Sequence, residues 1–196
     1  MFERHIDLAN GAYRLRPFKD GDDPGAVCNL VNEVYRVAER GIWKEEKDRV
    51  SVDDFVSSQS TGTTLVAYQG EKLAGTIHFI KTVTLSESST VEDSEKQKRV
   101  FRFEKLAVDP SYRGSGLGAE LVRAVESIAL EEKASSIEFE LLVSKGWKNE
   151  SKDKMQRWYS RLGFIMTGVK SVEAFVPQSV KFLENPAEFQ CWEKNL

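Results

Sequence analysis

The chain has 196 residues, 40% of them hydrophobic and 30% charged, which is typical of a water-soluble globular protein, and we expect a single domain over residues 1–196. The net charge of −3 excludes a general attraction to nucleic acid, and no apolar run approaches the roughly 18–20 residues that cross a membrane. Cys28 and Cys191 lie far apart and form no metal-binding spacing with the two histidines. We therefore expect reduced thiols, no metal, and a cytoplasmic protein with no nucleic-acid or membrane partner.

The spacing of apolar residues predicts the strands and helices of the first half of the chain. Apolar and polar residues alternate in the first predicted strand, whereas the first helix repeats its apolar residues at steps of three and four. Pro24 lies in the first turn of that helix, and Ser51 caps the next one. Gly70 marks the turn of a hairpin between two runs rich in β-branched and aromatic residues. These patterns predict, in chain order, a strand at residues 12–18, helices at 25–40 and 51–59, and paired strands at 63–69 and 72–83.

The second half of the chain follows a polar segment, residues 86–97, which we expect to be a solvated loop. An alternating strand then ends at Asp109-Pro110, after which a glycine-rich loop opens a long amphipathic helix. A later helix ends at Gly163, because glycine is the usual residue just past a helix C-terminus. We predict strands at 100–108, 136–143, 164–170 and 189–192, helices at 117–133 and 151–162, and a helical turn at 179–183.

The glycine-rich loop has the composition of an anion-binding site. Glycine lets the backbone approach an oxyanion closely and adopt a positive φ, while the first amides of the helix and its dipole supply partial positive charge. The arginine adds a full positive charge, and several convergent donors suit a diphosphate better than a single carboxylate. The loop consists of Arg113, Gly114, Ser115, Gly116, Leu117, Gly118 and Ala119.

Two other interpretations of this loop stay open. Glycines before a helix often form only a tight turn. The segment from Gly114 to Ala119 also fits the G-x-G-x-x-G/A fingerprint of dinucleotide-binding folds, with Glu138 or Glu140 about 20 residues further on. Against that fold, a segment containing Pro110 separates the strand from the glycines, and too little chain remains for further strand–helix units.

Two sequence motifs lie in order about forty residues apart. Residues 106–118 read LAVDPSYRGSGLG, and residues 158–164 read WYSRLGF. The first resembles the signature R/Q-x-x-G-x-G/A of the GNAT superfamily of N-acetyltransferases, including its preceding strand. The second resembles that family's later motif, in which a helix ends in Tyr-x-x-x-Gly-Phe and passes into a strand. Together with the order of elements, the resemblance covers the chain from about residue 12 to its end.

The resemblance implies an α+β fold with a twisted, mostly antiparallel sheet of about six or seven strands and about four flanking helices. Its fourth and fifth strands, at 100–108 and 136–143, would splay apart to admit the pantetheine arm of acetyl-CoA, the cofactor of the family. The glycine-rich loop would bind the pyrophosphate. The arm would pair with backbone of the fourth strand and would contact Leu106, Ala107 and Val108.

The resemblance also implies catalytic residues. Tyr159 occupies the position of the family's general acid, and a phenol with an ordinary pKa near 10 can protonate a departing thiolate at modest cost. Tyr159 also fits the role of a core aromatic residue beside Trp158 and Phe164. Glu104 is the candidate base, acting directly or through water, although a paired surface carboxylate fits the strand pattern as well. Glu140 on the adjacent strand is a second candidate, on the substrate side of the site.

One helix departs from the family pattern. Many relatives carry an asparagine about seven residues before the tyrosine and a small residue three positions later, where this chain has Lys152 and Met155. Lys148, Lys152 and Lys154 could approach the ribose phosphate, but a solvated helix face explains them better.

The sequence gives the least information about the acceptor pocket. In the family, the first two helices and the loop between them roof this pocket, which points to Tyr35, Glu39 and Trp43. With Glu45 and Glu46 nearby, Trp43 would suit a cationic amine through cation–π and charge attraction. Alternatively, the tryptophan packs the helices onto the sheet, and the acidic residues form ordinary surface.

Two functions from different classes fit these observations. The first is an N-acetyltransferase that moves an acetyl group from acetyl-CoA to a primary amine of a small molecule or peptide, directly within a ternary complex. The second is a non-catalytic acyl-CoA-binding sensor or interaction module, favoured by Lys152, Met155 and the lack of an obvious base. The intact glycine loop and Tyr159 favour the enzyme. A homodimer is also compatible with the sequence.

Overall fold

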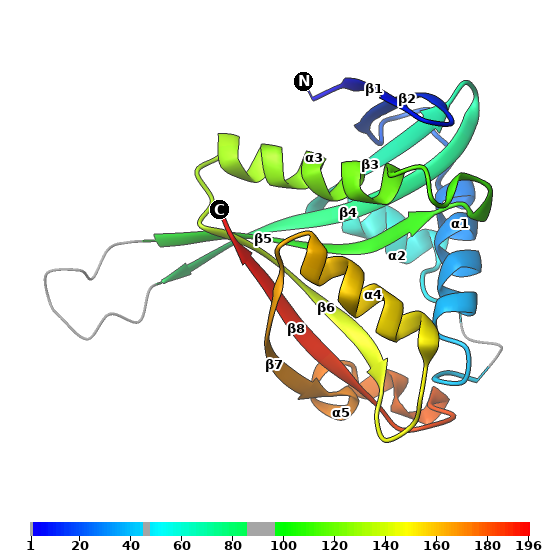
Figure 1. Cartoon of the computed structure of the whole chain (residues 1–196), viewed down its shortest axis with the longest axis vertical. Helices are drawn as coiled ribbons and strands as arrows, with labels where there is room; N and C mark the ends of the chain where they lie inside the picture. The colour runs from blue at the N-terminus through cyan, green and yellow to red at the C-terminus, as the bar shows by residue number, and fades with distance from the viewer. Residues whose placement is uncertain (1, 45–47, 86–96) are drawn as a thin grey trace, which may run out of the picture.

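A computed structural model describes residues 2–44, 48–85 and 97–196. Its strands are β1 Arg4–Leu8, β2 Gly11–Pro17, β3 Gly62–Gln69, β4 Lys72–Leu85, β5 Gln97–Val108, β6 Ser136–Ser144, β7 Ile165–Ser171 and β8 Ala187–Asn195. They form one sheet in the order β1-β2-β3-β4-β5-β6-β8-β7 (Figure 1). Neighbouring strands are antiparallel except β5 and β6, which run parallel.

Helices cover both faces of the sheet. They are α1 Pro24–Ala38, α2 Val52–Ser58, α3 Leu117–Glu131, α4 Glu150–Arg161 and α5 Val172–Phe175, with 3-10 helices η1 Pro110–Tyr112 and η2 Pro177–Phe182. In Figure 1, α3 and α4 lie on the near face, where their apolar sides complete a core with Phe103 and Phe139. α1 and α2 pack on the opposite face around Phe55 and Val66. The α5–η2 segment covers a smaller core that includes Phe189.

Capping side chains fix the start of α1, α2 and α4, and Ser171 caps the short α5 in the same way. Asp23, Ser51 and Asn149 each accept a hydrogen bond from an amide in the first turn of α1, α2 and α4, respectively. α3 differs, because its N-cap is Gly116, which has no side chain with which to bond the first turn. The start of α3 is therefore open to an external acceptor.

The two parallel strands separate along their length. Their pairing runs from Val100 opposite Ser136 to Arg102 opposite Glu138 and ends there. Within the described residues, β5 thus has no strand partner on its β6 side from Phe103 onward. The splayed central strands implied by the family resemblance are confirmed.

A β-bulge in β5 changes which residues face α3. The register against β4 shifts between Thr76 and His78, and Lys105 adopts a left-handed φ of 53°. Phe103 faces the α3 core before the bulge, and Leu106, three residues later, packs against the same core after it. In a regular strand Leu106 would point to the other face. The bulge therefore turns Leu106 to the face of the sheet that α3 covers.

The predicted elements match the structure except at a few short segments and element ends. β1 was not predicted and raises the strand count from six or seven to eight; it pairs with β2, and its Ile6 and Leu8 pack against the main core. The short helix α5 was also missed. The last strand is longer than the predicted 189–192 and spans Ala187–Asn195. Residues 86–96 of the expected polar loop lie outside the described residues, and β5 begins at Gln97.

Across residues 2–44, 48–85 and 97–196, no helix combines the length and apolar character needed to cross a membrane. In the same ranges, no three or more histidine, cysteine or carboxylate side chains are placed together to hold a metal ion. Cys28 and Cys191 are free thiols.

Candidate active site

A groove of about 950 Å³ opens where β5 and β6 separate. Its lining comes from the start of α3, from β5 and β6, from α1 and α4, and from the α5–η2 segment. Figure 1 shows α4 lying along β6 beside the gap. Segments far apart in the sequence therefore meet at one site.

The start of α3 lines the groove with backbone. Gly114 and Gly116 have left-handed φ values of 79° and 96°, and no atom lies within 4 Å of where a Cβ of Gly114 would stand. The amides of Gly114, Gly116 and Gly118 form no hydrogen bond to another described residue. Arg113 is exposed beside them. Three amide donors and a guanidinium suit a multi-oxygen anion such as a diphosphate.

Most residues predicted to contact the cofactor line this groove: Leu106, Val108, Arg113, Gly114, Gly116, Leu117, Gly118 and Ala119. Ala107 is instead buried in the core on the α1 side of the sheet. The Ser115 hydroxyl donates to the Tyr112 carbonyl at 2.7 Å and accepts from the Leu117 amide at 3.2 Å, so it closes the loop itself. The direct cofactor contacts of all ten residues stay predictions.

Tyr159 lies on the groove side of α4, only 3% exposed, among aromatic rings. Its ring centre is 4.1 Å from that of Phe139 and 4.7 Å from that of Trp158. Burial raises the pKa of its phenol, and the nearby Tyr35 acts in the same direction. The phenol therefore stays protonated across the physiological pH range. Tyr159 is thus a core aromatic residue whose protonated side chain lines the groove, and its role as the general acid stays a prediction.

Glu104 lies at the bulge of β5, where its side chain is 46% exposed and forms an ion pair with Lys105. Burial by itself would raise the pKa of the carboxyl, but Lys105, assisted by His78 and Arg49, lowers it below its usual value. Glu104 is therefore ionised at neutral pH. A carboxylate of low pKa suits attraction of an ammonium or orientation of a water molecule better than direct proton abstraction.

A buried ion pair joins the two helical walls of the groove. Lys152 of α4 and Glu39, at the end of α1, are 2% and 5% exposed, and Nζ lies 3.4 Å from Oε1. Trp43 Nε1 donates to Glu39 Oε2 at 2.7 Å, and Arg49 Nη1 lies 4.0 Å from the same oxygen. Burial favours the neutral form of Glu39, but Arg49, Lys152 and Trp43 outweigh it and lower the pKa of the carboxyl. Burial also lowers the pKa of Lys152, against the attraction of Glu39.

The prediction that Lys148, Lys152 and Lys154 form a solvated helix face is wrong for Lys152. The Lys148 side chain is 74% exposed, and Lys154 is exposed as well. Lys152 precedes Tyr159 by seven residues, about two helical turns, and both line the groove. That spacing was the signal that could have placed Lys152 inside.

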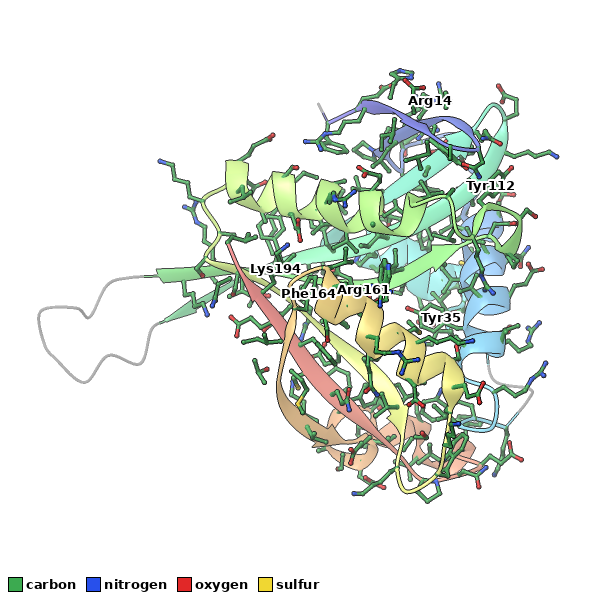
Figure 2. All side chains as sticks on the ribbon, in the orientation of Figure 1. Arg14, Tyr35, Tyr112, Arg161, Phe164 and Lys194 are labelled. Atoms are coloured by element: carbon green, nitrogen blue, oxygen red, sulfur yellow. The ribbon has the colours of Figure 1, made fainter. Side chains whose placement is uncertain are left out.

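The predicted acceptor residues divide between two cavities. Tyr35, Glu39 and Glu140 line the groove, and Figure 2 shows Tyr35 between α1 and α4. Trp43 lines a neighbouring cavity of about 550 Å³, which shares Tyr35, Glu39 and Arg49 with the groove. The acceptor roles of these residues stay predictions.

Two of these residues are already engaged within the chain. Trp43 is 8% exposed and packs in the core that contains Phe189, which agrees with the alternative that it packs the helices onto the sheet. The Glu140 carboxylate is 3.1 Å from Lys170 Nζ and 3.7 Å from Arg102 Nη1. Glu45 and Glu46, expected to add negative charge near Trp43, lie outside the described residues.

Comparison with known proteins gives the family. Residues 60–166, more than half of the chain, match the model of the acetyltransferase (GNAT) domain. This match includes the glycine-rich loop and Tyr159. The chain belongs to the GNAT acetyltransferase family.

Solved structures share the fold at low sequence identity. The protein smu.2055 of Streptococcus mutans UA159 superimposes with a TM-score of 0.64 at 16% identity, over 92% of this chain and 98% of that one. Arabidopsis thaliana NAA60, in complex with a bisubstrate analogue, gives 0.66 at 11% identity over 93% and 97%. A GNAT family acetyltransferase of Elizabethkingia anophelis with acetyl-CoA bound gives 0.61 at 12% identity over 94% and 98%. These similarities support the fold.

Proposed function

We propose that the protein transfers an acetyl group from acetyl-CoA to a primary amine of a small molecule or peptide, directly within a ternary complex. The observation that carries this proposal is one continuous groove, which starts at the free amides of the glycine loop, follows the unpaired side of β5 and reaches Tyr159. Membership of the acetyltransferase family supports the reaction class. The acetyl-CoA bound to the Elizabethkingia anophelis protein supports the cofactor.

The groove provides complementary chemistry for each part of the cofactor. The amides of Gly114, Gly116 and Gly118, with Arg113, would hold the pyrophosphate. The pantetheine amides would pair with β5 beyond the bulge, near Leu106, where no strand of the described residues competes for its hydrogen bonds. Both contacts use backbone groups, so the fit depends on the shape of the chain more than on its side chains.

In this proposal acetyl-CoA supplies the activated acetyl group. The residues of the chain orient the two substrates and protonate the departing sulfur. Tyr159 would donate its phenolic proton to the departing sulfur. Burial raises the pKa of this phenol, but it also raises the pKa of a thiol in the same apolar surroundings, so the proton transfer stays feasible. The amine would lose its proton to a water molecule that Glu104 orients, because the lowered pKa of Glu104 and its ion pair with Lys105 make this carboxylate a weak base. Holding both substrates together would supply much of the remaining acceleration.

A second function, a non-catalytic acyl-CoA-binding module, draws on one observation. The glutamates that line the groove, Glu39, Glu104 and Glu140, each pair with a cation of the chain, so none is an unoccupied base. The module would bind acetyl-CoA at the same loop without transferring the acetyl group.

The two functions separate in a single assay. Purified protein is incubated with acetyl-CoA and a panel of amino acids, polyamines, aminoglycosides and peptides, while CoA release and the acetylated product are both measured. We expect release and product together for at least one class of acceptor. Tight binding of acetyl-CoA with no product from any class would favour the module.

A further inference from the structure

Arg49 is held in a fixed position between the groove and the neighbouring cavity. The Asn32 side chain of α1 accepts hydrogen bonds from the amides of Arg49 and Val50 at 2.8 and 3.0 Å and donates to the Val50 carbonyl at 2.9 Å. The guanidinium carbon lies 5.4 Å from the centre of the Tyr35 ring, which supports it by a cation–π contact. Both the backbone and the side chain of Arg49 are thus anchored to α1.

The guanidinium of Arg49 has unused hydrogen-bonding capacity. It carries five N–H donors, yet among the described residues its ion pair is with Glu39 at 4.0 Å, which is beyond hydrogen-bond distance. No side-chain donor of Arg49 bonds to another residue in the described part of the chain. The side chain is 29% exposed and lines both cavities. A molecule in the groove can therefore reach these donors.

The carboxylates around Arg49 have other partners. Glu39 pairs with Lys152 and Trp43, Glu104 with Lys105, and Asp48 with Arg36, while Asp54 accepts from the Ser51 hydroxyl. Among the described residues, the positive charge of Arg49 is therefore only partly offset. Burial opposes this charge, but Glu39 and Tyr35 outweigh burial and raise the pKa of the guanidinium, which stays protonated at every working pH.

We infer that Arg49 binds a carboxylate of the acceptor, so that the substrate is an amine that also carries a carboxylate, such as an amino acid or a short peptide. A planar guanidinium binds a carboxylate through two parallel hydrogen bonds, a geometry that an ammonium group cannot provide. Tyr35 contacts Arg49, and both residues line the same groove as Tyr159. The acceptor would lie along Tyr35, with its carboxylate on Arg49 and its amine toward Tyr159. This inference rests on the proposed transfer reaction and names its substrate class.

The test compares matched acceptors that differ only in the carboxylate. Amino acids and dipeptides are assayed beside their C-terminal amides, with CoA release and product mass as readouts. We expect kcat/KM to be about ten- to a hundredfold higher for the carboxylates, the range of a hydrogen-bonded charge pair.

Variants assign this preference to Arg49. Arg49→Gln should raise KM for the carboxylates by that factor and leave KM for the amides and for acetyl-CoA unchanged. Arg49→Lys should restore part of the preference, because it keeps the charge but not the paired donors. Arg157→Gln is the control, since it removes an equivalent charge from the exposed side of α4. Thermal unfolding of each variant checks that it is folded.

The outcomes distinguish this inference from the proposed function. Equal rates for carboxylates and amides, or an Arg49→Gln variant that weakens both alike, would overturn the substrate assignment and leave the transferase intact. Acetylation of neither class, with acetyl-CoA bound, would overturn the proposed function and this inference with it.

Discussion

The cofactor wall and the acceptor wall of the groove are built in different ways. The cofactor wall is a contiguous loop that lines the groove, and its amides of Gly114, Gly116 and Gly118 form no hydrogen bond to another described residue. The acceptor wall is a set of charged side chains, with Glu39 of the α1 terminus bound to Lys152 of α4, 113 residues away. The first wall depends on local conformation and the second on tertiary packing. Substitutions in the two walls should therefore affect different quantities.

The largest effect is expected from Gly116→Glu in the cofactor wall. A glutamate at φ 96° is strained, and its carboxylate would repel the pyrophosphate at amides that should bind it. Loss of two or more charge-assisted hydrogen bonds predicts a drop in acetyl-CoA affinity of roughly a thousandfold. Calorimetric titration measures it.

Gly146→Glu is the matched control, because Gly146 also has a left-handed φ, 78°, with no atom near its Cβ position. This variant should bind acetyl-CoA normally. If Gly116→Glu bound acetyl-CoA with unchanged affinity, the assignment of the glycine-rich loop as the pyrophosphate site would be wrong. If the wild-type protein bound NAD as tightly as CoA, the dinucleotide-binding interpretation would be favoured instead.

Tyr159→Phe should separate chemistry from binding. Removal of the phenolic proton donor is expected to lower kcat by roughly a hundredfold while acetyl-CoA affinity stays constant. The aromatic packing against Phe139 is retained, so stability should change little. Tyr68→Phe is the control, because Tyr68 does not line the groove. Full activity of Tyr159→Phe would show that Tyr159 is not the general acid.

In the acceptor wall, Lys152→Met should mainly lower the free energy of unfolding. It leaves Glu39 buried without its closest cation, and breaking such a pair typically costs about 3 kcal/mol in the free energy of unfolding. The double variant Glu39→Leu with Lys152→Met should recover part of this loss, because both charges of the pair are removed, although Arg49 and Trp43 Nε1 lose Glu39 as a partner. Urea denaturation measures both, and a single variant as stable as wild type would show that the pair does not hold the wall together.

The smallest effect concerns acid stability. The pKa of Glu39 is lowered in the folded protein, so its contribution is present above the usual glutamate pKa and is lost as pH falls through the lowered value. Glu39→Gln should therefore be less stable than wild type at pH 7 but should lose less stability between pH 6 and pH 3. Asp22, whose pKa is lowered by Arg16, acts in the same window and keeps part of the acid sensitivity. Equal pH dependence in both proteins would contradict the charged state of Glu39.

The sequence predicted the local structure of the glycine loop well and the packing of the acceptor wall poorly, for a physical reason. The glycine loop and the order of strand, loop and helix are local patterns, and the structure joins them as expected. The positions of Lys152 and Arg49 depend on contacts with residues distant in sequence, which no local pattern reveals. The bulge at Lys105 was likewise hidden, because a non-glycine residue adopts its left-handed φ under tertiary constraint.

The most direct test of the central claim is a crystal structure of the protein with bound CoA. The account predicts pyrophosphate oxygens within hydrogen-bond distance of the amides of Gly114, Gly116 and Gly118, with pantetheine beside β5 in the gap toward β6. A pyrophosphate bound elsewhere, with those amides facing solvent or side chains, would contradict it.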